Sequence, residues 1–133
     1  MLKRTMKYED YNGNQITEDF YFNLTEAELA EMQLSVDGGM AALMETVVNT
    51  NDIPTLIKVF KKILLASYGK KSPDGKRFIK NDAIREEFEQ CPVYSDLFME
   101  LAGDATKAAN FINAIIPQSA RSQMETVPSP VNN

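Results

Sequence analysis

The stretch of this chain that comes nearest to a chemical motif is the lysine-rich segment SYGKKSPDGKRFIKND, residues 67–82. It holds two Gly-Lys pairs, and Gly69 and Gly75 lie six positions apart, which is close to the five-position spacing of the glycines in a phosphate-binding P-loop, G-x-x-x-x-G-K-[ST]. Arg77 occupies the position that needs a hydroxyl, and Pro73 removes an amide donor from the loop. We therefore expect no phosphate cradle, and the positive charge needs another explanation.

A calcium loop is a second candidate, because Asp10, Asn12 and Asn14 alternate as in the first half of an EF-hand loop. The glycine falls at position 13 when it should fall at 15, and Tyr21 stands where the bidentate glutamate belongs. A hairpin turn rich in asparagine explains the same residues. We expect no metal site here.

Nucleophilic and acid–base catalysis have little material in this sequence. Histidine is absent and Cys91 is the one cysteine, which excludes the commonest general base and any thiolate zinc cage. Cys91 lies in an apolar stretch and is expected in the core. The carboxylates of Glu86, Glu87 and Glu89 are expected on a solvated helix face. The sequence therefore predicts neither an enzyme nor a cofactor.

Charge is divided unevenly along the chain. The net charge is −5, yet residues 51–80 carry 8 basic and 2 acidic side chains, whereas residues 1–50 and 81–133 are net −6 and −5. This layout favours an acidic partner at the basic segment, or pairing between copies of the chain. The predicted partner-binding residues are Lys58, Lys62, Lys70, Lys71, Lys76, Arg77 and Lys80.

Three interpretations of this basic segment stay open: solvated charge, a docking surface for a protein or another copy, and a nucleic-acid grip. Tyr68 and Phe78 offer stacking surfaces for bases. A nucleic-acid binder is more often basic overall, and the acidic remainder of this chain would repel phosphates. Nucleic acid is therefore the least favoured of the three.

A β-hairpin is predicted for residues 1–23. Asn12-Gly13 is typical of a type I′ turn, which would place Lys7 opposite Glu18 and Thr5 opposite Phe20. Aromatic residues then fall on both faces of the ribbon, so we expect each face to be covered.

Residues 24–117 are predicted to be mainly helical. Thr25 and Glu28 form a capping box. Asp52 can cap a helix in which Pro54 suits the first turn and Gly69 is the stop. The predicted helical segments after the first are 38–48, 51–69, 83–90, 94–103 and 104–116, and the apolar stripe of the second of these is Ile53, Leu56, Ile57, Phe60 and Leu64.

The basic stretch is expected to be a loop with a turn at Pro73-Asp74-Gly75, followed by a short extended KRFI. Residues 118–133 are expected to be a disordered tail. The predicted fold is α+β and mostly α: an N-terminal hairpin and a bundle of five to six helices in one domain, residues 1–117. We expect no membrane span and no signal peptide.

Three segments together resemble the tail assembly chaperones of long-tailed bacteriophages, notably those of Gram-positive hosts. They are YEDYNGNQITEDFYFNLTEAELAEM near the start, SYGKKSPDGKRFIKND in the middle, and YSDLFMELAGDATKAANFINAIIP towards the end. The resemblance covers nearly all of residues 1–117, in order and spacing. Its motifs are structural, so it carries over no catalytic residue.

The resemblance implies a non-enzymatic chaperone that binds the tape measure protein and keeps it soluble during tail assembly. It implies work in the host cytoplasm and absence from the mature virion, and it allows self-association and a longer frameshifted form. The alternatives are a small nucleic-acid-binding or regulatory phage protein, and a structural component retained in the tail.

Overall fold

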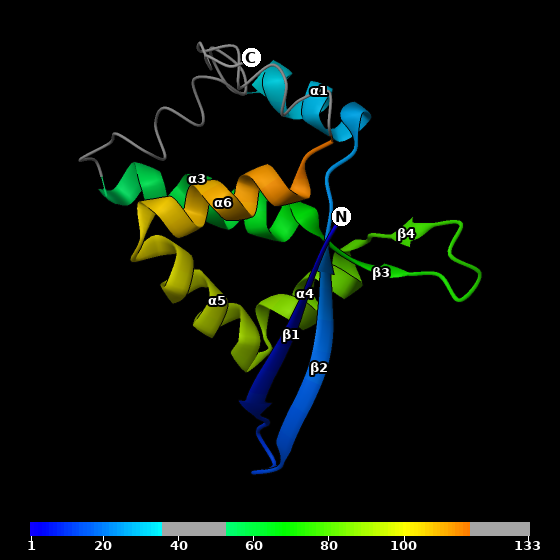
Figure 1. The fold of residues 1–133 in the computed structure, drawn as a ribbon, viewed down its shortest axis with the longest axis vertical. Helices are drawn as coiled ribbons and strands as arrows, with labels where there is room; N and C mark the ends of the chain where they lie inside the picture. The colour runs from blue at the N-terminus through cyan, green and yellow to red at the C-terminus, as the bar shows by residue number, and fades with distance from the viewer. Residues whose placement is uncertain (36–52, 118–133) are drawn as a thin grey trace, which may run out of the picture.

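The computed structural model describes residues 1–35 and 53–117, which form four strands and five helices (Figure 1). In chain order they are β1 (Leu2–Glu9), β2 (Gln15–Phe22), α1 (Glu26–Ser35), α3 (Ile53–Ser67), β3 (Tyr68–Lys71), β4 (Phe78–Ile79), α4 (Asp82–Glu89), α5 (Pro92–Ala102) and α6 (Ala105–Ile115). The predicted α+β chain with an N-terminal hairpin and at least five helices is confirmed for these residues. The predicted helix at 38–48, the Asp52 cap and the 118–133 tail lie outside them.

The first hairpin has a register one residue away from the predicted one. Thr5 pairs with Asp19 and Lys7 with Thr17. The tip is a three-residue loop: Gly13 donates its N–H to the Asp10 carbonyl at 3.0 Å, and its φ of +83° is left-handed. No non-glycine residue in the described ranges has a positive φ, so Asn12 does not make a type I′ turn.

This register gives the sheet one covered and one open face, so the prediction that both faces are covered is wrong. Along β1, Leu2, Met6 and Tyr8 are half-buried and alternate with exposed residues. They share a face with Phe20 and Phe22, which are buried, because cross-strand partners point to the same side. A one-residue shift of pairing exchanges the two faces of a strand, which is why the predicted register misplaced them.

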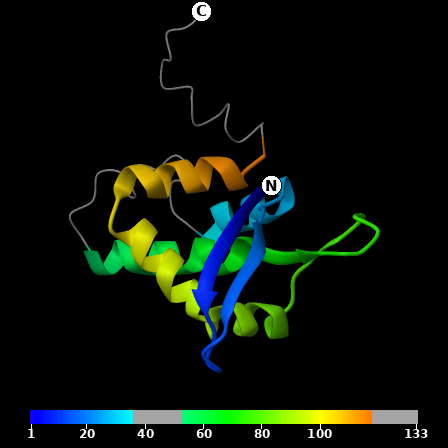
Figure 2. The ribbon, with the colours of Figure 1, turned by 60° about the horizontal axis from the view of Figure 1, so that its bottom comes forward.

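Residues 67–82 form a second hairpin and are not simply a loop. The strand order is β1-β2-β3-β4, all antiparallel, with Phe22 paired to Tyr68 and Lys71 to Phe78. Both Figure 1 and Figure 2 show α3 running directly into β3, and the tip of this hairpin projecting away from the helices. The extended KRFI piece is confirmed in its second half, as β4, whereas Lys76 and Arg77 belong to the turn before it. The turn at Pro73-Asp74-Gly75 is confirmed by a Gly75 N–H to Ser72 carbonyl bond of 2.9 Å.

Gly69 is a residue of β3 and not the helix stop that was predicted. A Cβ at this position would lie 2.7 Å from a ring carbon of Phe78 and 2.9 Å from the Ile79 carbonyl oxygen. Glycine is therefore needed because β4 crosses closely, and not because the backbone turns.

An aromatic cluster joins the sheet to the helices. Phe22 has no exposed surface, and its ring centroid lies 5.3 to 5.8 Å from those of Tyr68, Phe88 and Phe111. Burial of Tyr68, at 9% exposure, contradicts its suggested role as a free stacking surface. The cluster fixes β2, β3, α4 and α6 relative to one another.

The capping box predicted at the start of α1 is formed. The Thr25 hydroxyl accepts from the Glu28 N–H at 3.1 Å, and the Glu28 carboxylate accepts from the Thr25 N–H at 2.8 Å. Asn81 caps α4 through the Ile84 N–H, at 2.8 Å. In α3, Phe60 and Leu64 are buried as predicted, but Ile57 is 39% exposed. Among residues 1–35 and 53–117 there is no helix whose length and apolarity would let it cross a membrane.

Candidate functional site

The predicted basic residues do not form one continuous patch. Lys80 is a structural cation: its ammonium lies 2.7 Å from the Glu28 carboxylate and 2.7 Å from the Asn23 carbonyl oxygen, and its side chain is only 15% exposed. It thereby ties the end of β4 to the start of α1. The positive charge of Lys80 is therefore neutralised within the fold.

Two further lysines are paired with α4 at the surface. Lys70 lies 3.2 Å from Glu87, and Lys61 lies 3.2 Å from Glu89, a hydrogen bond that raises the pKa of Lys61. Both pairs are exposed, and such pairs contribute little to stability. They nevertheless reduce the net positive field that a partner would meet on this side of α4.

In the second hairpin, Lys71, Lys76 and Arg77 have side chains that a partner could reach. Lys71 lies on the open face of the sheet, with its ammonium 4.7 Å from the Tyr21 ring centroid, whereas Lys76 and Arg77 are exposed in the turn between β3 and β4. This turn is internally braced. The carboxylate of Asp74 accepts from the Ser72 hydroxyl at 2.6 Å and from the Lys76 N–H at 3.0 Å, which lowers the pKa of Asp74. Lys58 and Lys62, on α3, have exposed side chains.

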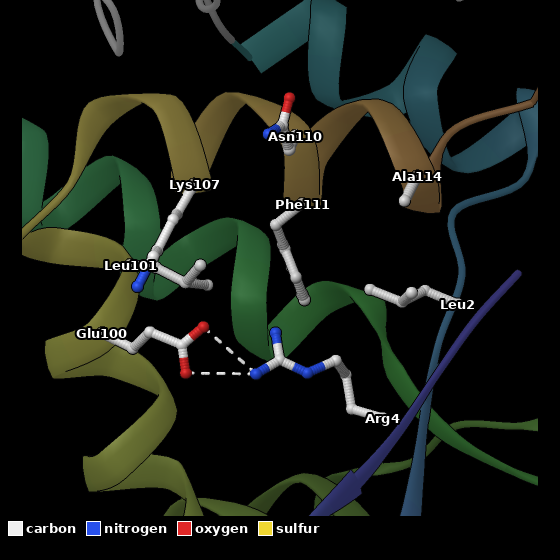
Figure 3. A pocket seen from close by; sticks show the side chains of 8 residues that line it. All are labelled: Leu2, Arg4, Glu100, Leu101, Lys107, Asn110, Phe111 and Ala114. Atoms are coloured by element: carbon white, nitrogen blue, oxygen red, sulfur yellow. Dashed lines mark hydrogen bonds and ion pairs between the residues drawn. The ribbon is translucent and has the colours of Figure 1, made fainter.

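The second feature is a groove of about 330 Å³ between β1 and the helices α5 and α6 (Figure 3). We call it the β1–α6 groove, and it is lined by Leu2, Arg4, Glu100, Leu101, Lys107, Asn110, Phe111 and Ala114. Its volume is at the lower end of the roughly 300–1,000 Å³ typical of ligand pockets. Space of this size suits one or two large side chains better than a cofactor.

Charge in the β1–α6 groove is only partly balanced. One terminal nitrogen of Arg4 lies 3.1 Å from both oxygens of Glu100, a link between β1 and α5. In Figure 3 the other terminal nitrogen of Arg4 points away from Glu100, on the side of Phe111. Lys107 is exposed and has no ion pair with any residue in the described ranges. The groove therefore carries a net positive charge of one.

No local sequence pattern indicated this groove. Its walls come from residues 2–4 and 100–114, nearly a hundred positions apart, and the pairing of Arg4 with Glu100 depends on tertiary packing. One feature of the sequence could have indicated this wall of the groove. Lys107 and Ala114 are seven residues apart and so share a helix face beside the apolar Phe111.

Tyr8 and Cys91 lie in surroundings that serve the fold. Tyr8 donates its hydroxyl to Glu18 at 2.7 Å, and this hydrogen bond raises the pKa of Tyr8 well above its usual range. Cys91 is half-buried against the core, as expected. Within the part of the chain that the structure describes, no group of three or more His, Cys, Asp or Glu side chains could hold a metal ion.

Comparison with known proteins gives one family. The sequence model of the family described as "Phage tail assembly chaperone" matches residues 1–131. This match spans nearly the whole chain of 133 residues, so the protein belongs to the phage tail assembly chaperones. Membership implies a client protein in tail assembly. No curated protein and no solved structure gives a significant match.

Proposed function

We propose that this chaperone binds the tape measure protein of its phage and keeps it soluble until the tail tube forms around it. Family membership over residues 1–131 is the observation that carries the proposal. A tape measure protein is long and largely helical, and exposed apolar stripes on such a molecule promote aggregation unless they are covered. A small protein with an apolar groove can cover them by helix-in-groove contacts.

The available surface chemistry fits weak, repeated binding. The β1–α6 groove is small, and the free cations on the second hairpin are few, so each chaperone copy would hold its client weakly. Many weak contacts along one client add up to strong overall retention, while each copy can still be displaced by an arriving tube subunit.

We assign the second hairpin a docking role. The turn between β3 and β4, which contains Lys76 and Arg77, projects from the body of the molecule (Figure 1), and Lys71 precedes it on the open face of the sheet. These three cations would meet an acidic face of the client or of a neighbouring copy. Lys58, Lys62 and Lys70 extend the same basic segment, whereas Lys80 supports it from inside.

Co-expression tests the proposal directly. The tape measure protein is produced in bacteria with and without this chain, and its soluble fraction is measured after centrifugation. We expect the soluble fraction to rise several-fold with the chaperone present. If the tape measure protein stays in solution equally well by itself, the proposed function is wrong.

Charge reversal tests the docking role. Changing Lys70, Lys71 and Lys76 to Glu should reduce client solubility or self-association, whereas Lys7→Glu on the first hairpin should change neither. If the triple variant leaves both properties unchanged, the hairpin is not a docking surface.

The proposal includes a place and a time of action. We place the protein in the host cytoplasm, as a single domain of residues 1–117, and absent from the finished virion. Mass spectrometry of purified virions separates this from a structural tail component, which would be retained. A nucleic-acid role has less support, because Tyr68 is buried against Phe88 and offers no stacking surface.

A further inference from the structure

We propose that the β1–α6 groove receives one apolar side chain of a helical client segment that carries an Asp or Glu about one helical turn away, with that carboxylate paired to Lys107. This inference rests on the proposed function, because it specifies which kind of client segment the chaperone selects. It assigns the apolar half of the contact to Leu2, Phe111 and Ala114.

The shape of the groove favours a helical client. Lys107, Phe111 and Ala114 follow one another along one face of α6 at intervals of four and three residues. Lys107 and Phe111 are therefore separated by about 6 Å along the helix axis, at 1.5 Å per residue. A client helix lying alongside α6 has the same spacing between residues i and i+4, so its carboxylate and its apolar side chain match these two positions.

The small size of Ala114 keeps the apolar end of the groove open. Leu101 and Phe111 are buried, at 2% and 4% exposure, and form its floor, whereas Leu2 and Ala114 are half-buried at its sides. A larger residue at position 114 would occupy the space that the client side chain needs. The same replacement leaves the buried floor unchanged.

Charge selects an acidic client over a basic one. Glu100 is already neutralised by Arg4, with both carboxylate oxygens 3.1 Å from the same nitrogen. Lys107 and the remaining nitrogens of Arg4 are then the charged donors left for a client, beside the side-chain amide of Asn110. A client carboxylate finds partners here, whereas a client lysine meets a net positive charge.

The test uses overlapping peptides of the tape measure protein, each about 25 residues long, and the full-length chaperone. Binding is measured by fluorescence anisotropy. We expect the peptides that bind to carry an apolar residue with Asp or Glu three or four positions away. Ala114→Leu should weaken their binding about tenfold, the effect of losing one well-placed contact. Ala83→Leu, the same change at an exposed position of α4, should leave binding unchanged.

Exchanging the charge at Lys107 tests its pairing with the client carboxylate and does not alter the floor of the groove. Lys107→Glu should weaken binding about tenfold, because an attraction is replaced by a repulsion. A peptide whose carboxylate is replaced by Lys should then bind the Lys107→Glu chaperone more tightly than it binds the wild type. Lys7→Glu, on the open face of β1, is the matched control.

Each negative outcome overturns a different statement. Unchanged peptide binding in both Ala114→Leu and Lys107→Glu would overturn the groove assignment, while the co-expression result would still stand. Self-association of the chaperone that Ala114→Leu abolishes would assign the groove to a second copy and also overturn it. Failure of the wild type to solubilise the tape measure protein would instead overturn the proposed function.

Discussion

Tyr68 and Phe88 stack face to face, with ring centroids 4.2 Å apart and ring planes inclined by 15°. Tyr68 is the first residue of β3 and Phe88 lies in the last turn of α4, so the stack attaches the basic hairpin to the helical part. The ring centroids of Phe20 and Phe22 each lie within 6.2 Å of the centroids of both Tyr68 and Phe88. The second hairpin, which is a surface element, is thus positioned by a buried aromatic cluster.

Removing this anchor should destabilise the whole domain. Tyr68→Ala is expected to lower the free energy of unfolding by about 3–5 kcal/mol, as for other buried aromatic truncations. Tyr11→Ala, at the tip of the first hairpin where the side chain is 84% exposed, should change it by less than about 0.5 kcal/mol. Urea unfolding followed by circular dichroism measures both. Equal effects at the two positions would contradict the role given to the stack.

Gly69 should not tolerate even a methyl group. The added Cβ meets the Phe78 ring at 2.7 Å and the Ile79 carbonyl at 2.9 Å, so Gly69→Ala should cost about 1–3 kcal/mol through overpacking. Phe78→Ala in the same chain removes the ring but not the carbonyl. The double variant should therefore lose less stability than the sum of the single changes, as measured in a double-mutant cycle. Strict additivity would show that the ring is not the obstacle.

Two lysines of the second hairpin segment, Lys80 after β4 and Lys76 in the turn before it, should differ sharply. Lys80→Met leaves the Glu28 carboxylate and the Asn23 carbonyl without their shared donor, and is expected to cost about 1–3 kcal/mol. Lys76→Met alters an exposed charge and should cost less than about 0.5 kcal/mol. Thermal unfolding distinguishes them. A similar melting temperature for both variants would mean that the Lys80 contacts add nothing to stability.

Alkaline pH should destabilise the protein through Tyr68. Burial, aided by the charges of Glu18 and Glu87, raises the pKa of Tyr68 from 10.0 to about 12. A pKa that is higher in the folded state means that this contribution to stability is complete below pH 10 and is lost as the pH rises towards 12. Urea unfolding between pH 9 and pH 12 should show this decline. Tyr68→Phe should make it less steep, and an unchanged slope would contradict the assignment.

Local chemistry in the sequence predicted much of the helical part. The capping box of Thr25 and Glu28 is formed, and the helix predicted at 104–116 exists as α6, with its buried residues at helical spacing: Ala108, Phe111, Ile112 and Ile115. Helix caps and helix faces depend on residues within about one or two turns of each other. They can be inferred without knowing how distant segments pack.

The sheet was harder to predict because its pairing is decided by small differences and distant partners. Asn12-Gly13 fits both a two-residue and a three-residue hairpin loop, and the choice shifts every pair of β1 and β2 by one. The strand at Tyr68–Lys71 exists because β2, nearly fifty residues earlier, offers it an edge. Two lysines in succession gave no local sign of a strand.

The candidate site shows the same limit. Residues adjacent in the sequence were grouped as one basic surface, but the structure half-buries Lys80 in a pair with Glu28, pairs Lys70 with Glu87, and leaves Lys71 on another face. The β1–α6 groove is built from β1, α5 and α6, which lie nearly a hundred residues apart, so no short window of sequence contains it.

The position of Leu2 at the wall of that groove has a practical consequence for anyone who purifies the protein. An affinity tag fused ahead of Met1 would emerge one residue from the pocket's rim, and a flexible, histidine-rich peptide there would compete with the molecule being captured. Pull-down assays with such a fusion would report weak or missing interaction for a reason unrelated to biology. Affinity tags are better attached elsewhere, or removed by cleavage before binding is measured.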